Sequence, residues 1–315
     1  MMDEYMKKDF IDLTDFAKKE IVSLLDLADD IKKNPEEYSQ KMKGKTLLMI
    51  FDKASLRTRV SFEAGMTQMG GHAIYYNVSD SPLGKKETMS DTAKTASRYV
   101  DMIMARIGSH DDLIDLAKNS TVPVINAMTN FAHPCQILAD LQTIREKKGS
   151  SGKLKLAYLG DSNNNVTHSL IFGCVIMGMN ISVGCPKGKE YEPLQEVIER
   201  AESLAEKSGA VLKITNDAKD AAKDADVIYT DSWMSYHIPE NKKEERINIF
   251  RPYQINKKLL GFAKPDAIFM NCLPAMRGME QTAEVIDGPQ SVVFDQAENR
   301  LHTEKALMLR LLDIE

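Results

Sequence analysis

Short runs of apolar residues alternate along the chain with longer stretches in which apolar and polar positions follow a helical spacing. The short runs predict buried strands, and the longer stretches between them predict helices. We expect strands at residues 46–51, 72–78, 100–107, 122–127, 155–161, 181–185, 210–215, 226–231 and 266–272. Regular alternation of strands with helices predicts an α/β fold in which parallel sheets are flanked by helices on both faces.

A polar Gly/Ser stretch, KKGSSGK at residues 147–153, separates the first four expected strands from the last five. A chain of 315 residues is long for one small domain and sufficient for two. The sequence therefore predicts a first domain over residues 1–148 and a second over 149–298.

Composition narrows the class of protein. Hydrophobic residues make up 43% of the chain, and the net charge is −5, so no basic excess points to nucleic acid or to an anionic membrane. The first residues lack a signal-peptide pattern, and no run reaches membrane-spanning length. Four widely spaced cysteines without a CxxC pair predict neither disulfides nor a metal site. We therefore expect a cytoplasmic enzyme without a metal.

The segment SLRTR at residues 55–59 places anion-binding groups directly after a strand and before a helix. Ser55 and Thr58 carry hydroxyl donors, and the planar guanidinium of Arg57 suits phosphate oxygens. A helix start adds backbone N–H groups and the positive end of the helix dipole. The plainer alternative is that Ser55 only caps the helix and that both arginines are solvated.

Two further polar groups follow strands of the first half. Arg106 ends an apolar strand, where a buried arginine needs a partner. His133 precedes a proline in the loop after the fourth strand, and Gln136 follows close behind. A histidine can donate to a carbonyl oxygen and a glutamine can bind an amide, although a lone histidine is more often a satisfied core group.

The second half repeats this placement. Asn163–Asn165, Asp231 and Cys272 follow three of its strands. Ligands bind beyond the carboxyl ends of parallel strands, so the two sets predict one cleft between two domains. Asp231 could instead cap a turn, and Cys272 could be a small buried hydrophobe. A dinucleotide site is disfavoured, because only Gly160 of a GxGxxG pattern is present.

Taken together, SLRTR, Arg106, HPCQ (133–136), NCLPAMRG (271–278) and AENRLHTEKALM (297–308) resemble the aspartate/ornithine carbamoyltransferases, most closely the ornithine enzymes. The resemblance runs in register from about residue 8 to 312. It implies a carbamoyl phosphate-binding first domain, an acceptor-binding second domain with the active site between them, and a homotrimer or a multiple of trimers. It also implies transfer of a carbamoyl group to ornithine, as part of arginine metabolism, with no cofactor.

By position, the resemblance assigns roles to individual residues. Ser55, Arg57, Thr58 and the backbone of Leu56 would hold the phosphate, while Arg106, His133 and Thr58 would polarise the carbamoyl oxygen. Gln136 would hold the carbamoyl amide. Arg300 would return to this site from a C-terminal segment, 299–315, whose helix we expect at roughly 302–313 and packed on the first domain. Lys86 would reach the neighbouring subunit's site.

The resemblance also places the acceptor amine. Asn165 would contact its amino-acid end, Asp231 would pair with the ammonium group, and Ser235 would assist. Tyr236 would form part of the wall around the acceptor. Cys272 and Leu273 would lie beside the reacting amine and carbamoyl group.

Several positions depart from the ornithine enzymes. Ser235-Tyr236-His237 stands where they usually carry SMG, Asn271 replaces a histidine, and Lys86 in the loop at 81–92 matches the aspartate enzymes instead. Aspartate is disfavoured as the acceptor because Asp231 would repel a dicarboxylate. Putrescine and an N-acylated ornithine stay open as alternatives, as does a phosphometabolite-binding relative without activity.

Overall fold

The computed structural model describes residues 8–80, 87–149, 153–234 and 238–314. The chain forms two compact units, Met1–Ala139 with Glu298–Glu315, and Asp140–Ala297. Two helices, α5 (Pro134–Lys148) and α12 (Val293–Leu311), each begin in one unit and end in the other. The division therefore falls within α5, upstream of the Gly/Ser-rich stretch.

The first unit is built on a parallel four-stranded sheet in the order β2-β1-β3-β4. Its strands are β1 (Thr46–Phe51), β2 (His72–Asn77), β3 (Met102–Arg106) and β4 (Val124–Met128). Its helices are α1 (Lys18–Lys33), α2 (Leu56–Gln68), α3 (Met89–Ala96) and α4 (His110–Asn119). β3 and β4 are buried at every position, as expected for strands covered on both faces.

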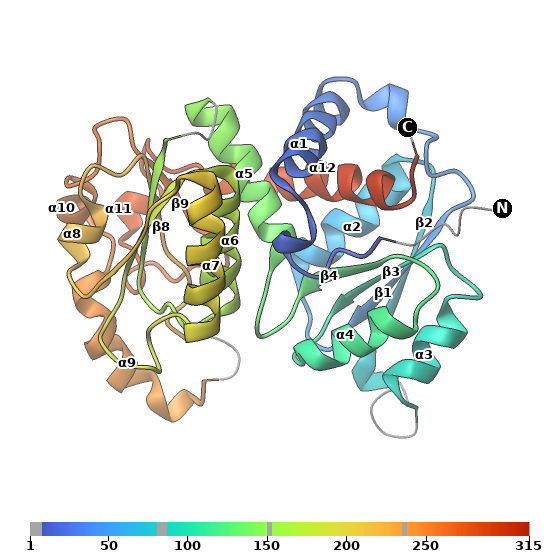
Figure 1. Cartoon of the computed structure of the whole chain (residues 1–315), viewed down its shortest axis with the longest axis horizontal. Coiled ribbons are helices and arrows are strands. Elements are labelled where there is room, and N and C mark those ends of the chain that lie inside the picture. The colour runs from blue at the N-terminus through green and yellow to red at the C-terminus, as the bar shows by residue number, and fades with distance from the viewer. Residues whose placement is uncertain (1–7, 81–86, 150–152, 235–237, 315) are drawn as a thin grey trace. The chain divides into compact units, whose positions relative to one another are not determined.

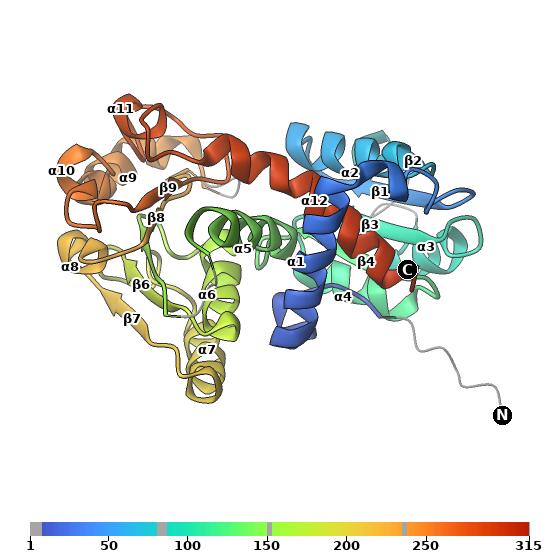
Figure 2. The same cartoon turned by 90° about the horizontal axis from the view of Figure 1, so that it is seen from above.

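Helices cover both faces of this sheet (Figure 1). Apolar residues of α3 and α4 pack with β1, β3 and β4 in one buried cluster. On the other face lie α1, α2 and the last part of α12 (Figures 1 and 2). Here Gly65 of α2 faces α12, and a Cβ atom at this position would lie in contact with the side chains of Lys305 and Met308 at 3.4 Å. The part of α12 from Glu298 onward is thus a layer of the first unit.

The second unit is built on a parallel five-stranded sheet in the order β7-β6-β5-β8-β9. Its strands are β5 (Lys155–Leu159), β6 (Asn180–Gly184), β7 (Leu212–Thr215), β8 (Val227–Tyr229) and β9 (Ile268–Met270). Its helices are α6 (Asn165–Met177), α7 (Gln195–Ser208), α8 (Ala218–Ala222), α9 (Lys243–Phe250), α10 (Lys257–Leu260) and α11 (Ala283–Ile286). Figure 1 shows α6 and α7 on one side of this sheet and α8, α10 and α11 on the other.

Short 3-10 helices occupy Leu13–Asp15, Pro35–Tyr38, Val78–Asp80, Glu240–Lys242 and Arg251–Tyr253. No helix among the described residues is long and apolar enough to cross a membrane. The two-sheet α/β fold and all nine expected strands are confirmed.

The starts of two helices bear on the sequence-based prediction. Gln136 lies in the first turn of α5, because the helix starts at Pro134. Proline is well suited to that position, since its backbone has no N–H to leave unsatisfied. The C-terminal helix begins at Val293, earlier than the expected start near residue 302.

Candidate active site

The start of α2 is organised by Ser55. This residue is extended, and its side-chain oxygen accepts a hydrogen bond from the backbone N–H of Thr58 at 3.4 Å. Ser55 is therefore an N-cap, as the plainer interpretation held. Capping leaves other first-turn N–H groups directed out of the helix end, where they attract anions. Leu56, the first helical residue, is 75% exposed, so its backbone rather than its apolar side chain suits a polar site.

The two arginines of this turn differ in their surroundings. Arg59 forms an ion pair with Glu63, with Nε and Oε2 3.1 Å apart. Its guanidinium also lies 3.9 Å from the centre of the Tyr75 ring. Arg59 thus holds α2 and β2 together on the surface. Arg57 is half-buried and contributes to the electrostatic field at His133, which places its positive charge near the other candidate site residues.

The hydroxyl group of Thr58 joins two arginines that are far apart in the sequence. Thr58 is buried, and its Oγ1 accepts from Nη1 of Arg106 at 3.3 Å and from Nη2 of Arg300 at 3.4 Å. A hydroxyl has two acceptor lone pairs and one proton. With both lone pairs used by guanidinium groups, the Thr58 hydroxyl can act toward a further group only as a donor.

Arg300 is held from two sides. Its Nε and Nη2 lie 2.8 and 2.6 Å from Oε1 of Glu304, and its Nη1 donates to Oε1 of Gln136 at 2.9 Å. Both Arg300 and Glu304 are almost completely buried. Glu304 was missed at the sequence level, although the Arg300–Glu304 spacing of four residues is a recognisable signal for a helical ion pair. Starting the helix too late hid that signal.

His133 lies directly before α5 and is buried. Burial lowers the pKa of its imidazole well below the usual value of 6.5, and the positive charges of Arg300, Arg106 and Arg57 lower it further. The imidazole is therefore neutral at physiological pH. A neutral histidine can donate one hydrogen bond to a carbonyl oxygen without acting as a strong acid.

In the second unit, the loop after β5 begins α6 with an asparagine cap. Asn164 is buried, and its Oδ1 accepts from the backbone N–H of Thr167 at 2.9 Å. Asn165 is the first helical residue and is half-buried. The capping side chain is thus Asn164, which leaves the side chain of Asn165 beyond the cap at the helix start.

Asp231 and Cys272 meet at the carboxyl ends of β8 and β9. The Cys272 thiol donates to Oδ1 of Asp231 at 3.1 Å, and both residues are half-buried. Leu273 follows with φ at 55°, a left-handed conformation that is uncommon for a bulky residue. Asp231 follows β8, and Cys272 and Leu273 follow the adjacent strand β9, so the pairing of these strands brings the three residues together.

A buried ion pair supports the same unit and was missed at the sequence level. Arg246 pairs with Asp161 and donates from Nε to the backbone oxygen of Trp233 at 2.7 Å. Burial raises the pKa of Asp161 to about 7, although Arg246 opposes the shift. The pair ties the loop after β5 to the loop after β8, on which Asp231 lies. Nothing local links residues 85 positions apart, so no sequence pattern could reveal it.

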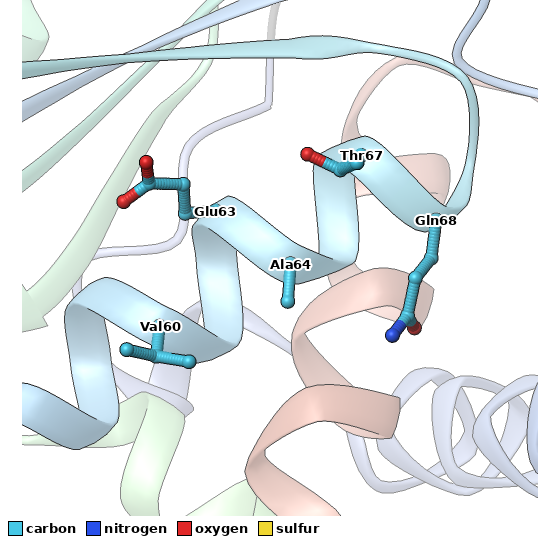
Figure 3. Close-up of a pocket in the computed structure, with 5 residues that line it drawn as sticks. All are labelled: Val60, Glu63, Ala64, Thr67 and Gln68. Atoms are coloured by element: carbon cyan, nitrogen blue, oxygen red, sulfur yellow. The ribbon is translucent and has the colours of Figure 1, made fainter.

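Three expected site residues, Lys86, Ser235 and Tyr236, lie outside the described residues. A pocket of about 350 Å³ lies on α2, lined by Val60, Glu63, Ala64, Thr67 and Gln68. Figure 3 shows Val60, Ala64 and Gln68 following one line along the helix. None of these residues is among the candidate site residues, so this pocket is separate from the arginine cluster around Thr58.

Comparison with known proteins agrees with this architecture. The carbamoyl-P binding domain model of aspartate/ornithine carbamoyltransferase matches residues 8–146, and the Asp/Orn binding domain model matches residues 152–311. The ornithine carbamoyltransferase of Methanosarcina acetivorans is 52% identical over 309 residues, which cover 98% of this chain and 100% of that protein. That of Bacillus subtilis is 50% identical, covering 97% and 94% of the two chains.

Solved structures give the same result. Ornithine carbamoyltransferase from Pyrococcus furiosus superposes with a TM-score of 0.92 at 50% identity, covering 96% of each chain. The enzyme from Giardia lamblia superposes with a TM-score of 0.89 at 41% identity, covering 98% of each chain. The chain belongs to the aspartate/ornithine carbamoyltransferase family.

Proposed function

We propose that this protein transfers the carbamoyl group of carbamoyl phosphate to the side-chain amine of ornithine, giving citrulline and phosphate. The amine nitrogen attacks the carbamoyl carbon, and the bond from that carbon to the phosphate oxygen breaks. The departing phosphate accepts the proton that the amine loses. The observation that carries the proposal is the joining of Thr58, Arg106, Gln136 and Arg300 by hydrogen bonds beside a neutral His133.

This cluster supports binding of carbamoyl phosphate in the first unit. Arg57 and the N-terminus of α2 supply positive charge for the phosphate, together with the Ser55 hydroxyl. Negative charge develops on the carbamoyl oxygen as the amine attacks. Donors fixed in advance around that oxygen, here Arg106, His133 and Thr58, lower the barrier because they need no reorganisation during the reaction. Gln136 is oriented by Arg300 to bind the carbamoyl amide.

Asp231 and Cys272 support binding of the amine in the second unit. A carboxylate attracts the ammonium form of the acceptor and orients its nitrogen, and it stabilises positive charge until the proton leaves. The thiol of Cys272 donates to Asp231, so an arriving ammonium group competes with the thiol for the same carboxylate. An acceptor with a positively charged side-chain terminus fits this site better than a dicarboxylate.

The test is phosphate release from carbamoyl phosphate with each of four acceptors: ornithine, putrescine, N-acetylornithine and aspartate. We expect turnover with ornithine, confirmed as citrulline. Turnover with putrescine or N-acetylornithine and none with ornithine would show that ornithine is not the acceptor. Phosphate release that no amine raises above the rate measured without protein would contradict carbamoyl transfer.

A matched pair of variants tests the phosphate site. Arg57→Ala is expected to abolish turnover, because it removes the half-buried positive charge near His133. Arg59→Ala lies on the same helical turn and removes a surface ion pair with Glu63 and the contact with the Tyr75 ring, neither of which involves a candidate site residue, so it serves as the control. Near-normal activity of Arg57→Ala would show that phosphate binds elsewhere.

We also propose that the chain acts in the cytoplasm as a homotrimer or a multiple of trimers. Four free thiols support a reducing compartment. An apolar stretch on α2 supports association, since Leu56 and Val60 are 75% and 52% exposed beside the pocket of Figure 3. Light scattering should give three chain masses of 35.3 kDa each, or a multiple of three. A monomer or dimer at working concentration would contradict this assembly.

A further inference from the structure

Asn271 directly follows β9 and is buried at 1% exposure. Its Oδ1 accepts from the backbone N–H of Leu273 at 2.7 Å, and its Nδ2 donates to Oε1 of Gln281 at 3.3 Å. The side chain thus closes a tight turn around Cys272. It bonds to the backbone of the turn and to Gln281, in the buried interior of the unit.

The turn that Asn271 closes needs such support. Leu273 has φ at 55°, a backbone conformation that persists in bulky L-residues only where the surroundings impose it. The bond from Leu273 to Oδ1 of Asn271 is the contact that fixes its N–H. Cys272 lies between the two residues, so the same turn sets the direction of its thiol toward Asp231.

The buried side-chain amide of Gln296 bonds to the backbone of Asn271. Oε1 of Gln296, on α12, accepts from the backbone N–H of Asn271 at 3.0 Å. Nε2 of Gln296 donates to Oδ1 of Asp140 at 2.7 Å and to the hydroxyl of Tyr229 at 3.1 Å. The Tyr229 hydroxyl in turn donates to Asp140 at 3.0 Å. All of these side chains are fully buried, so they form a fixed polar network beneath the turn.

We propose that Asn271 and Gln296 are positioning residues that fix the turn at Cys272 and Leu273 for carbamoyl transfer. The expected effect of these residues on carbamoyl transfer rests on the proposed function, whereas their effect on the conformation of the turn does not. Neither residue contacts the Asp231 carboxylate in the hydrogen bonds described. Each acts on the reacting groups through the backbone, Asn271 at Leu273 and Gln296 at Asn271.

Thiol labelling of Cys272 measures the state of the turn without any substrate. Cys272 is half-buried, whereas Cys135, Cys174 and Cys185 are buried. The fast phase of thiol labelling in the native protein therefore reports on Cys272. A thiol that donates its proton to a carboxylate reacts slowly, because the thiolate is the nucleophile. Release of the turn frees the thiol from Asp231 and speeds labelling. Cys272→Ala supplies the baseline.

Two variants open the turn from different sides. Gln296→Met keeps the side-chain length and removes the bonds to Asn271, Asp140 and Tyr229. Asn271→Ala removes the bonds to Leu273 and Gln281 and leaves the bonds of Gln296 in place, so it remains informative if Gln296→Met does not fold. Gln290→Met is the matched control, because Gln290 also donates to the backbone beside β9, but at its opposite end, to Ala267 at 2.7 Å.

We expect roughly tenfold faster labelling of Cys272 in Gln296→Met and Asn271→Ala, because they lose three and two buried hydrogen bonds, respectively, at or beneath the turn. We expect kcat with ornithine to fall by a similar factor, while KM for carbamoyl phosphate changes less than about twofold. Gln290→Met should match the wild type. Unchanged labelling in the folded variants, or equally fast labelling in Gln290→Met, would overturn the proposal. The labelling result stands even if no amine supports turnover, so a failure of the proposed function is recognised separately.

Discussion

Replacing Arg300 and Glu304 by methionine, singly and together, separates two roles of this buried pair. Oε1 of Glu304 lies 2.8 and 2.6 Å from Nε and Nη2 of Arg300, with both side chains at most 2% exposed. Removing one partner leaves the other charge buried without its counter-ion, at a cost of about 3–5 kcal/mol in the free energy of unfolding. Removing both charges together is often neutral or stabilising. We therefore expect two unstable single variants and a double variant near wild-type stability.

We expect the double variant to lose activity even though its stability is close to that of the wild type. Arg300 also donates to Gln136 at 2.9 Å and to Thr58 at 3.4 Å, and these bonds are lost in the double variant. A hydrogen bond from a charged donor is worth about 1.5–3 kcal/mol. Losing the orientation of Gln136 alone should thus lower kcat/KM for carbamoyl phosphate by roughly 10- to 100-fold.

Thermal unfolding and steady-state kinetics of the wild type, the two single variants and the double variant test both expectations. The single variants should unfold on the order of 10 °C below the wild type, and the double variant close to it. A double variant as unstable as the singles would show that the pair is not coupled. A double variant with wild-type kcat/KM would show that the bonds of Arg300 to Gln136 and Thr58 contribute nothing to the reaction.

Two further predictions concern His133 and Lys86. Because the folded pKa of His133 is lowered by burial and by three arginines, the unfolded chain binds more protons below pH 6.5, and stability falls as the pH drops below that value. Thermal unfolding between pH 5 and 8 should show a shallower acid loss in His133→Gln than in the wild type, and equal slopes would contradict the lowered pKa. If Lys86 completes a neighbour's site in a cyclic trimer, mixing inactive Arg57→Ala and Lys86→Ala chains by unfolding and refolding should restore about a quarter of wild-type activity. No recovery, with each variant trimeric, would place Lys86 within its own subunit's site.

The sheets were predictable because each strand is a short apolar run bounded by polar residues. β3 and β4, buried at every position, are the clearest examples. Helix ends were less predictable. The first two turns of α12, VFDQAENR, carry charged and amide residues, and Phe294 among them is 72% exposed. They lack the continuous apolar stripe that marks a helix, so the start at Val293 could not be read from the pattern.

The site residues with recognisable chemistry were also predictable, since strand ends in a parallel sheet collect functional groups. The sequence did not reveal the buried residues that hold these site residues in place. Glu304 could have been found from its helical spacing to Arg300. Gln296 and Asp140 could not, because their contact joins positions 156 residues apart and neither carries a motif of its own.

Asn271 shows how this support changes the meaning of a substitution. From the sequence, asparagine in place of the usual histidine left the acceptor amine in doubt. In the structure its side chain bonds to Leu273 and Gln281 and is buried, so it shapes the turn rather than the wall of an acceptor site. A residue selects between amines only if its side chain reaches the part in which they differ. The substitution at 271 therefore carries no weight against ornithine, and acceptor preference must be sought in side chains that contact the amine.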